Sequence, residues 1–275
     1  MAEGGAPGGR SVEAESWETL RVERDGDLLR VTLDNPDKAN ALSPAMLREL
    51  TLLYRRPLLA EGVRAVILSG AGKHFSAGAD LAHLRSLQDA RHEDHRLDSE
   101  RLRGLFEAVL RQEALTIALV HGSCVAGGCG LATAHDFVVA AADARFLYSE
   151  VRIGFVAALV ATFLPLRVAG RDLRELLLNP DFLAAERALE IGLVNRVVAR
   201  EELAAAGVAL AAEVLERASS QSIALTKRLL LDALGRPLEE ALERAAEVNA
   251  AARATDDCKR GIAYCLEHKQ PPTWR

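Results

Sequence analysis

The chain of 275 residues lacks the features that mark several large protein classes. None of its seven histidines has the HExxH spacing of a zinc site, so we expect no metal. No apolar run approaches the roughly 18 residues of a membrane span, and residues 1–16 lack the apolar segment of a signal peptide. The net charge is −5 and no basic stripe occurs, which argues against a nucleic-acid partner. We therefore expect a cytoplasmic protein that binds neither membranes nor nucleic acid.

Two further absences concern disulfides and nucleotide loops. The four cysteines include no CxxC pair, so we expect reduced thiols. No GxGxxG occurs, and Gly72-Lys73 lacks the neighbours that a phosphate-binding loop requires. What the chain does have is 49% hydrophobic residues, which is enough to bury a sizeable core.

Short apolar runs alternate with helical patterns up to about residue 200, which indicates an α/β arrangement. We expect a hairpin around Asp25-Gly26 and a helix that begins at Ser43-Pro44. Further strands are expected in three apolar segments, at 63–70, 115–120 and 137–142. The highly polar residues 82–98 favour a solvated or mobile segment.

The domain organisation follows from a change of pattern near residue 200. Residues 1–16 are small and charged, and they resemble a disordered tail. Residues 17–200 form the predicted α/β core. Residues 201–275 carry nearly continuous helical periodicity, and we expect a separate helical region there.

Two glycine-containing segments stand out, "HFSAGADL" at 74–81 and "VAGGCGL" at 125–131. Each places small residues where a strand ends, so main-chain N–H groups are left without partners. A helix that begins near Gly127 would add the positive end of its dipole. Singly, each segment is explained as a tight turn. Together they predict two N–H donors that converge on one anionic oxygen, which is an oxyanion hole.

These segments resemble the crotonase superfamily, the enoyl-CoA hydratase/isomerase family, and the resemblance runs from about residue 18 to 270. The similar stretches are "LDNPDKANALSPAMLREL", "AVILSGAGKHFSAGADL", "HGSCVAGGCGLATAHDFVVAAADARF" and "ERALEIGLVNRVV". The resemblance implies a crotonase-like spiral of ββα units, followed by a helical trimerisation region. It also implies an acyl-CoA substrate, a homotrimer or hexamer, and no cofactor, since coenzyme A is part of the substrate.

The resemblance assigns roles to individual residues. The N–H groups of Ala79 and Gly127 would hold the thioester oxygen as it becomes an enolate oxygen. Five residues would lie against the coenzyme A moiety: Lys38, Ala39, Ala77, Gly78 and Asp80.

The residues that would serve as acid and base match the family only in part. Family hydratases use two glutamates; the first position is Gly130 in this chain, and the second is Glu150 in "ARFLYSEVRIGF". From the residues alone, Glu150 would be a surface carboxylate beside Arg152. From the resemblance, Glu150 is both base and acid. The "SEVRIG" run is similar to the methylglutaconyl-CoA-hydratase-like members.

Three functions stay open. Hydration of a 2-enoyl-CoA to a 3-hydroxyacyl-CoA is the first expectation. Isomerisation of an enoyl-CoA double bond suits a single glutamate that takes a proton from one carbon and returns it to another. A non-catalytic protein that binds acyl-CoA is the third, because Gly130 supplies no acid.

Overall fold

The structure is a computed structural model that describes Val12 and residues 15–274. Its main sheet has six strands in the order β1-β2-β3-β4-β6-β9, parallel except for the antiparallel β1–β2 hairpin. These strands are β1 (Leu20–Asp25), β2 (Leu28–Leu33), β3 (Ala65–Gly70), β4 (Leu115–Val120), β6 (Phe137–Ala141) and β9 (Arg196–Val198). The predicted strands are confirmed, but the hairpin turn is shifted by one residue. Asp25 pairs with Leu28, so the turn is Gly26-Asp27, with Gly26 at a φ of 64°.

A second, smaller sheet gives the chain its spiral course. Its order is β5-β7-β8, with β5 (Ser123–Val125), β7 (Arg145–Leu147) and β8 (Leu183–Ala184). β4 leads into β5 and then into a helix, and β6 leads into β7 and then into helical turns. Each such unit places one strand in the large sheet and one in the small sheet. This is the predicted arrangement of ββα units.

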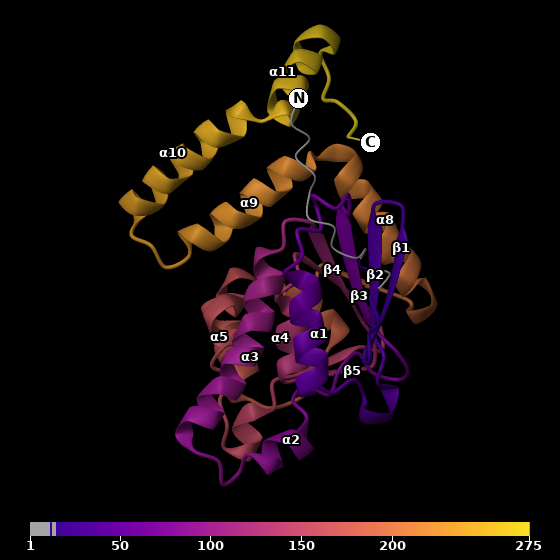
Figure 1. The fold of residues 1–275 in the computed structure, drawn as a ribbon, viewed down its shortest axis with the longest axis vertical. Helices are drawn as coiled ribbons and strands as arrows, with labels where there is room; N and C mark the ends of the chain where they lie inside the picture. The colour runs from indigo at the N-terminus through magenta and orange to yellow at the C-terminus, as the bar shows by residue number, and fades with distance from the viewer. Residues whose placement is uncertain (1–11, 13–14, 275) are drawn as a thin grey trace, which may run out of the picture.

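Helices cover both faces of the large sheet, which explains why every residue of β4 is buried. On one face lie α1 (Pro44–Tyr54), α3 (His92–Arg111) and α4 (Gly127–Thr133), as Figure 1 shows. On the other face lies α8 (Leu203–Arg217). The remaining helices of the core are α2 (Leu81–Ser86), α5 (Val160–Phe163), α6 (Gly170–Leu178) and α7 (Ala185–Glu190), with short 3-10 turns η2 (Pro36–Lys38), η3 (Glu150–Ile153), η4 (Leu164–Leu166) and η5 (Arg200–Glu202).

The start of α1 and the polar segment 82–98 test two predictions made from the sequence. The Ser43 hydroxyl accepts a hydrogen bond from the Met46 N–H at 3.2 Å, with Pro44 as the first helical residue, as predicted. Residues 82–98 are mostly exposed, in line with the prediction of a solvated or mobile segment, but the segment has regular structure. α2 and the first two turns of α3 occupy it, because ion pairs such as Arg96–Glu100 connect successive turns of an exposed helix surface.

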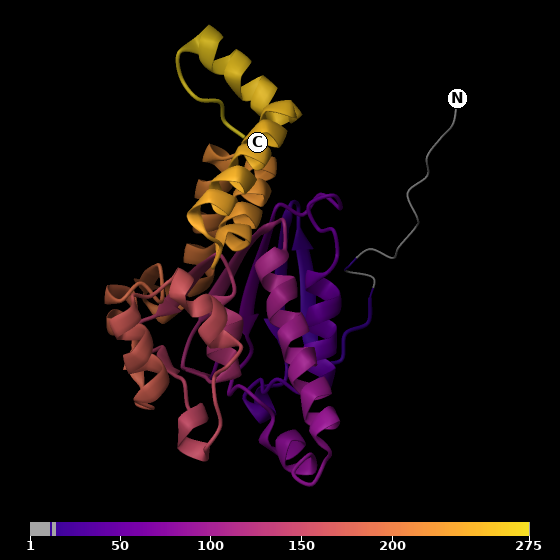
Figure 2. The same ribbon diagram turned by 90° about the vertical axis from the view of Figure 1, so that its left-hand side faces the viewer.

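The last three helices form an arm that projects from the core (Figures 1 and 2). They are α9 (Ser220–Ala233), α10 (Leu238–Ala254) and α11 (Asp256–His268). The predicted boundary near residue 200 needs a correction, since α8 packs on the large sheet and the arm begins only at α9. Of the predicted tail 1–16, most lies outside the described residues. Val12 is buried in the core, and Glu15 forms an ion pair with Arg56.

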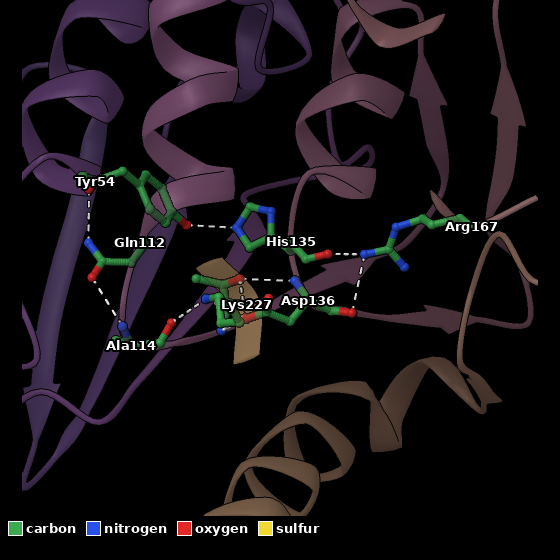
Figure 3. A network of polar contacts seen from close by, with 8 residues as sticks. Tyr54, Gln112, Ala114, His135, Asp136, Arg167 and Lys227 are labelled. Carbon is green, nitrogen blue, oxygen red and sulfur yellow. Dashed lines mark hydrogen bonds and ion pairs between the residues drawn. The ribbon is translucent and has the colours of Figure 1, made fainter. Parts of the chain in front are cut away.

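A partly buried polar network connects the arm to the core at His135 and Asp136, just after the end of α4 (Figure 3). Lys227 of α9 lies 2.6 Å from the carboxylate of Asp136 and donates to the carbonyl of Ala114 at 2.7 Å. His135 Nδ1 lies 2.8 Å from the carbonyl of Leu131 and therefore carries the proton, so its Nε2 accepts from the Tyr54 hydroxyl at 2.7 Å. Burial lowers the pKa of His135 to about 3, so this ring is neutral and serves as a structural link.

No helix within the described residues is long and apolar enough to cross a membrane. Within the described residues, the four cysteines form no disulfide.

Candidate active site

The first glycine-containing segment runs beside the chain that leads into α1. The Ala77 N–H donates to the Ala39 carbonyl at 2.8 Å, and the Leu42 N–H donates to the Gly78 carbonyl at 2.7 Å. Asp80 then caps α2 by accepting from the Ala82 N–H at 2.9 Å. The structure thus brings together the residues predicted to contact coenzyme A, namely Lys38, Ala39, Ala77, Gly78 and Asp80.

The second segment contains the start of α4. As expected, the helix begins at Gly127. The preceding residue, Ala126, has a φ of 47° and a ψ of −120°, a conformation that costs a non-glycine residue of the order of 1–3 kcal/mol. The Ala126 N–H donates to the Leu147 carbonyl at 2.7 Å, which attaches the helix start to β7.

The two segments touch through their backbones. A Cβ on Gly78 would lie 2.5 Å from the Val125 carbonyl oxygen and 3.2 Å from the Gly127 nitrogen. A Cβ on Gly127 would lie 3.9 Å from the Ala79 nitrogen. Side chains at Gly78 would therefore push the segments apart, and glycine permits the close approach.

The N–H groups of Ala79 and Gly127 have no acceptor within residues 15–274. Because a peptide is planar and trans, the Ala79 N–H points away from the Gly78 carbonyl, which Leu42 already occupies. The Gly127 N–H is likewise opposed to the Ala126 carbonyl, which accepts from the Gly130 N–H at 3.2 Å. Two unpaired donors on neighbouring backbones, one of them at a helix N-terminus, are suited to a developing negative charge.

Glu150 lies on the chain that leaves β7, the strand to which the start of α4 is hydrogen-bonded. β5 pairs with β7 so that Val125 is opposite Leu147, and Glu150 begins η3 three residues later. Its residue is 9% exposed, and its Oε2 is buried with no hydrogen-bond partner in the described structure. Burial raises the pKa of this carboxyl, and a backbone hydrogen bond partly opposes the shift.

The alternative interpretation of Glu150 as a surface carboxylate beside Arg152 does not fit the structure. Arg152 is half exposed and forms its ion pair with Asp181 at 3.6 Å. A buried carboxylate oxygen without a partner is costly to the fold, and such groups are common where an acid or base must exchange protons.

Gly130 lies in the first turns of α4, and the space around it is filled by apolar side chains. A Cβ there would lie 2.6 Å from Val160 Cγ2 and 2.7 Å from Phe106 Cζ. Phe106 in turn packs edge-on against Phe163, with ring centroids 5.5 Å apart. The place where a second acid would project is therefore part of the core.

Sequence reasoning missed two buried polar residues beside the site, Asn40 and Ser76. Their side chains hold backbone groups of residues 35–42 and 71–78. No periodicity marks such residues, because their partners are main-chain atoms of other loops. Among the described residues, no three His, Cys, Asp or Glu side chains gather as metal ligands would.

The amino-acid sequence is similar to those of known proteins of one family. The sequence pattern of the enoyl-CoA hydratase/isomerase family matches residues 23–275. A Thermus thermophilus protein with the provisional name enoyl-CoA hydratase is 42% identical over 253 residues, covering 92% of this chain and 99% of its own. The human mitochondrial Delta(3,5)-Delta(2,4)-dienoyl-CoA isomerase is 34% identical over 271 residues, covering 94% of this chain and 82% of its own.

A solved structure shows the same fold. The crystal structure of an enoyl-CoA hydratase from Mycobacterium smegmatis superposes with a TM-score of 0.85 at 31% identity, covering 94% of this chain and 99% of that one. The α/β fold predicted from the sequence is confirmed.

The packing around Gly130 leads to a stability prediction. Gly130→Ala should lower the free energy of unfolding by about 1–3 kcal/mol, because the added methyl overlaps Val160 and Phe106. Adding Val160→Ala should recover part of that loss, since the two sites are in contact. Chemical denaturation measures both effects.

Gly170→Ala is the matched control, because a Cβ at Gly170 meets no atom within 4 Å. If Gly130→Ala unfolds at the same denaturant concentration as wild type, the space at Gly130 is not filled as described.

Proposed function

The chain belongs to the enoyl-CoA hydratase/isomerase family, and we propose that it adds water to the double bond of a 2-enoyl-CoA, giving a 3-hydroxyacyl-CoA. The predicted resemblance is confirmed at the level of the family, and the chain is an enoyl-CoA hydratase or isomerase. One observation supports Glu150 as the acid and base: it presents a buried, unpaired carboxylate oxygen on the segment bonded to the start of α4. Hydration is placed first because the Thermus thermophilus relative carries a hydratase name.

In the proposed reaction, Glu150 moves one proton in two steps. Its carboxylate first takes a proton from water as the water oxygen bonds to C3, and the double-bond electrons move onto the thioester oxygen. The Ala79 and Gly127 N–H groups hold that enolate oxygen; removing one such donor typically costs about 3–4 kcal/mol. The carboxyl group then gives the same proton to C2, which restores the carbonyl. Because a single group serves both steps, the hydroxyl and the proton arrive on one face.

The coenzyme A moiety is proposed to lie along the paired segments 38–42 and 77–80. The Lys38 ammonium is 4.0 Å from the Asp80 carboxylate and largely exposed, so it is accessible to a phosphate group. None of the steps above requires a cofactor besides the coenzyme A of the substrate.

Isomerisation is the second candidate, and Gly130 is the observation that favours it. With no second acid and no space for one, a 3-enoyl-CoA could lose a proton from C2 to Glu150 and regain it at C4 through the same enolate. The relative from human mitochondria that is named an isomerase belongs to this reaction class. A protein that only binds acyl-CoA would need no buried carboxylate, so it is the least supported alternative.

We also propose that the arm forms the contacts of a homotrimer. Its helices expose large apolar side chains that a lone chain would leave in water: Leu230, Leu238, Leu242, Ile262 and Leu266. Light scattering should give a mass three or six times the chain's 29.6 kDa, and a mass of one chain would contradict the proposal.

The decisive variant is Glu150→Gln, which keeps the shape and removes the base. We expect kcat to fall by about 10²–10⁴-fold on the best substrate, while Glu190→Gln, at an exposed glutamate, leaves it unchanged. The assay uses straight, branched and carboxylated 2-enoyl-CoA and 3-enoyl-CoA thioesters in ¹⁸O-labelled water. Label at C3 indicates hydration, and a moved double bond without label indicates isomerisation.

The pH profile supplies a second readout of the same variant. Glu150 acts first as its ionised form and its pKa is raised, so the acidic limb of kcat/KM should lie above the ordinary carboxyl value of 4.5. A raised pKa in the folded state also means that stability falls as pH increases above that value, so Glu150→Gln should melt higher than wild type at neutral pH. Unchanged turnover in the variant would remove Glu150 from the site.

A further inference from the structure

Ser76 is a buried hydroxyl that connects the two halves of the proposed oxyanion hole. Its Oγ–H donates to the Asn40 carbonyl at 2.8 Å, and its Oγ accepts from the Gly78 N–H at 3.1 Å. Its main-chain oxygen accepts from the Val125 N–H at 3.0 Å, and a Cβ on Gly128 would lie 2.8 Å from the Ser76 Cβ. One fully buried residue thus contacts the loop that carries Ala79 and the first turn of α4.

The hydrogen bonds from the Asn40 carbonyl through the Ser76 hydroxyl to the Gly78 N–H form a relay. The side chain of Asn40 holds this relay in position. Its Nδ2 lies 2.9 Å from the carbonyl oxygens of Ala71 and His74 and 3.1 Å from that of Phe75. Its Oδ1 accepts from the Asn35 N–H at 3.0 Å. Asn40 is fully buried and has a backbone φ of 53°, which is uncommon for residues other than glycine. Its four side-chain contacts stabilise this conformation and aim its carbonyl at Ser76.

The relay fixes the direction of the Ala79 N–H. Gly78 is held at its N–H by Ser76 and at its carbonyl by Leu42, so neither peptide that flanks Gly78 is free to rotate. The Ala79 N–H belongs to the second of these planar peptides. Without the Ser76 hydroxyl, the bond from Leu42 would be the one hydrogen bond left to Gly78 among the described residues, and this glycine has a φ of 81°.

We propose that Ser76, supported by Asn40, is a positioning residue that orients the Ala79 N–H toward the enolate oxygen. This inference rests on the proposed function and adds to it two residues that touch neither substrate nor reacting atoms. Loss of this positioning should affect one part of substrate binding and not the other. Losing the relay weakens binding of the anionic oxygen and leaves binding of the coenzyme A moiety in place.

Two probes separate these effects without turnover. Acetoacetyl-CoA ionises to an enolate and uses the oxyanion hole, whereas free coenzyme A uses only the contacts along 38–42 and 77–80. For Ser76→Ala we expect the affinity for acetoacetyl-CoA to fall about 10-fold, because small misplacements of a donor have large effects on a developing charge. The affinity for coenzyme A should stay nearly unchanged.

Ser123→Ala is the matched control. Ser123 is a buried serine of the adjoining strand β5, and its hydroxyl accepts from the Arg145 Nε at 3.0 Å, away from Gly78. It should lower the affinities for both probes little or equally. Asn40→Gly tests the support for the relay, since glycine accepts the φ of 53° and loses the four side-chain contacts. Because Asn40 also braces the stretch 38–42 that is proposed to contact coenzyme A, Asn40→Gly should lower both affinities, and that for acetoacetyl-CoA more.

The outcomes are distinguishable. If wild type binds acetoacetyl-CoA no better than coenzyme A, the proposed function fails. If wild type prefers acetoacetyl-CoA and Ser76→Ala retains the full preference, the positioning role is overturned while the function stands. Equal loss of both probes in Ser76→Ala would show a merely structural role and would also overturn it.

Discussion

The backbone contact between residues 76–78 and the start of α4 is the constraint on which the rest of the site depends. At Gly78 the two backbone segments approach so closely that a single added methyl group would overlap the Val125 carbonyl. This approach places the two unpaired N–H groups on neighbouring backbones. Both sheets position these segments. The first segment follows β3 of the large sheet, and the second follows β5 of the small sheet.

Backbone strain is concentrated at the same place. Four non-glycine residues of the described chain have positive φ, and three of them, Ala39, Asn40 and Ala126, flank the two segments. The fourth, Lys269, ends a helix. Strained conformations persist only where the surroundings enforce them, and here buried hydrogen bonds and the packing of α4 do so. The unpaired oxygen of Glu150 adds a further local cost. The core, with its doubly covered sheet and the network around His135 and Lys227, provides the stability that tolerates these costs.

Much of this arrangement was predictable from local signals. The strands coincide with apolar runs, α1 begins at Ser43-Pro44, and α4 begins at its glycines, Gly127 and Gly128. Unpaired main-chain N–H groups at these strand ends were predictable from their small residues, whereas the choice of Ala79 and Gly127 as oxyanion donors came from the family resemblance and stays a proposal. Three features were not predictable from local pattern. The helices at 82–98 depend on ion pairs between turns, the filled space at Gly130 depends on Phe106 and Val160 from other elements, and the relay through Ser76 depends on backbone atoms distant in sequence.

The central claim is that the Ala79 and Gly127 N–H groups polarise a thioester carbonyl. The most direct measurement is the infrared carbonyl stretch of crotonyl-CoA labelled with ¹³C at C1, bound to Glu150→Gln so that the thioester is not consumed. The account predicts a stretch at lower wavenumber than that of the same thioester in water, because two fixed donors aimed at the oxygen weaken the C=O bond. A stretch at or above the value in water would contradict the account, since the carbonyl would then lie outside the oxyanion hole.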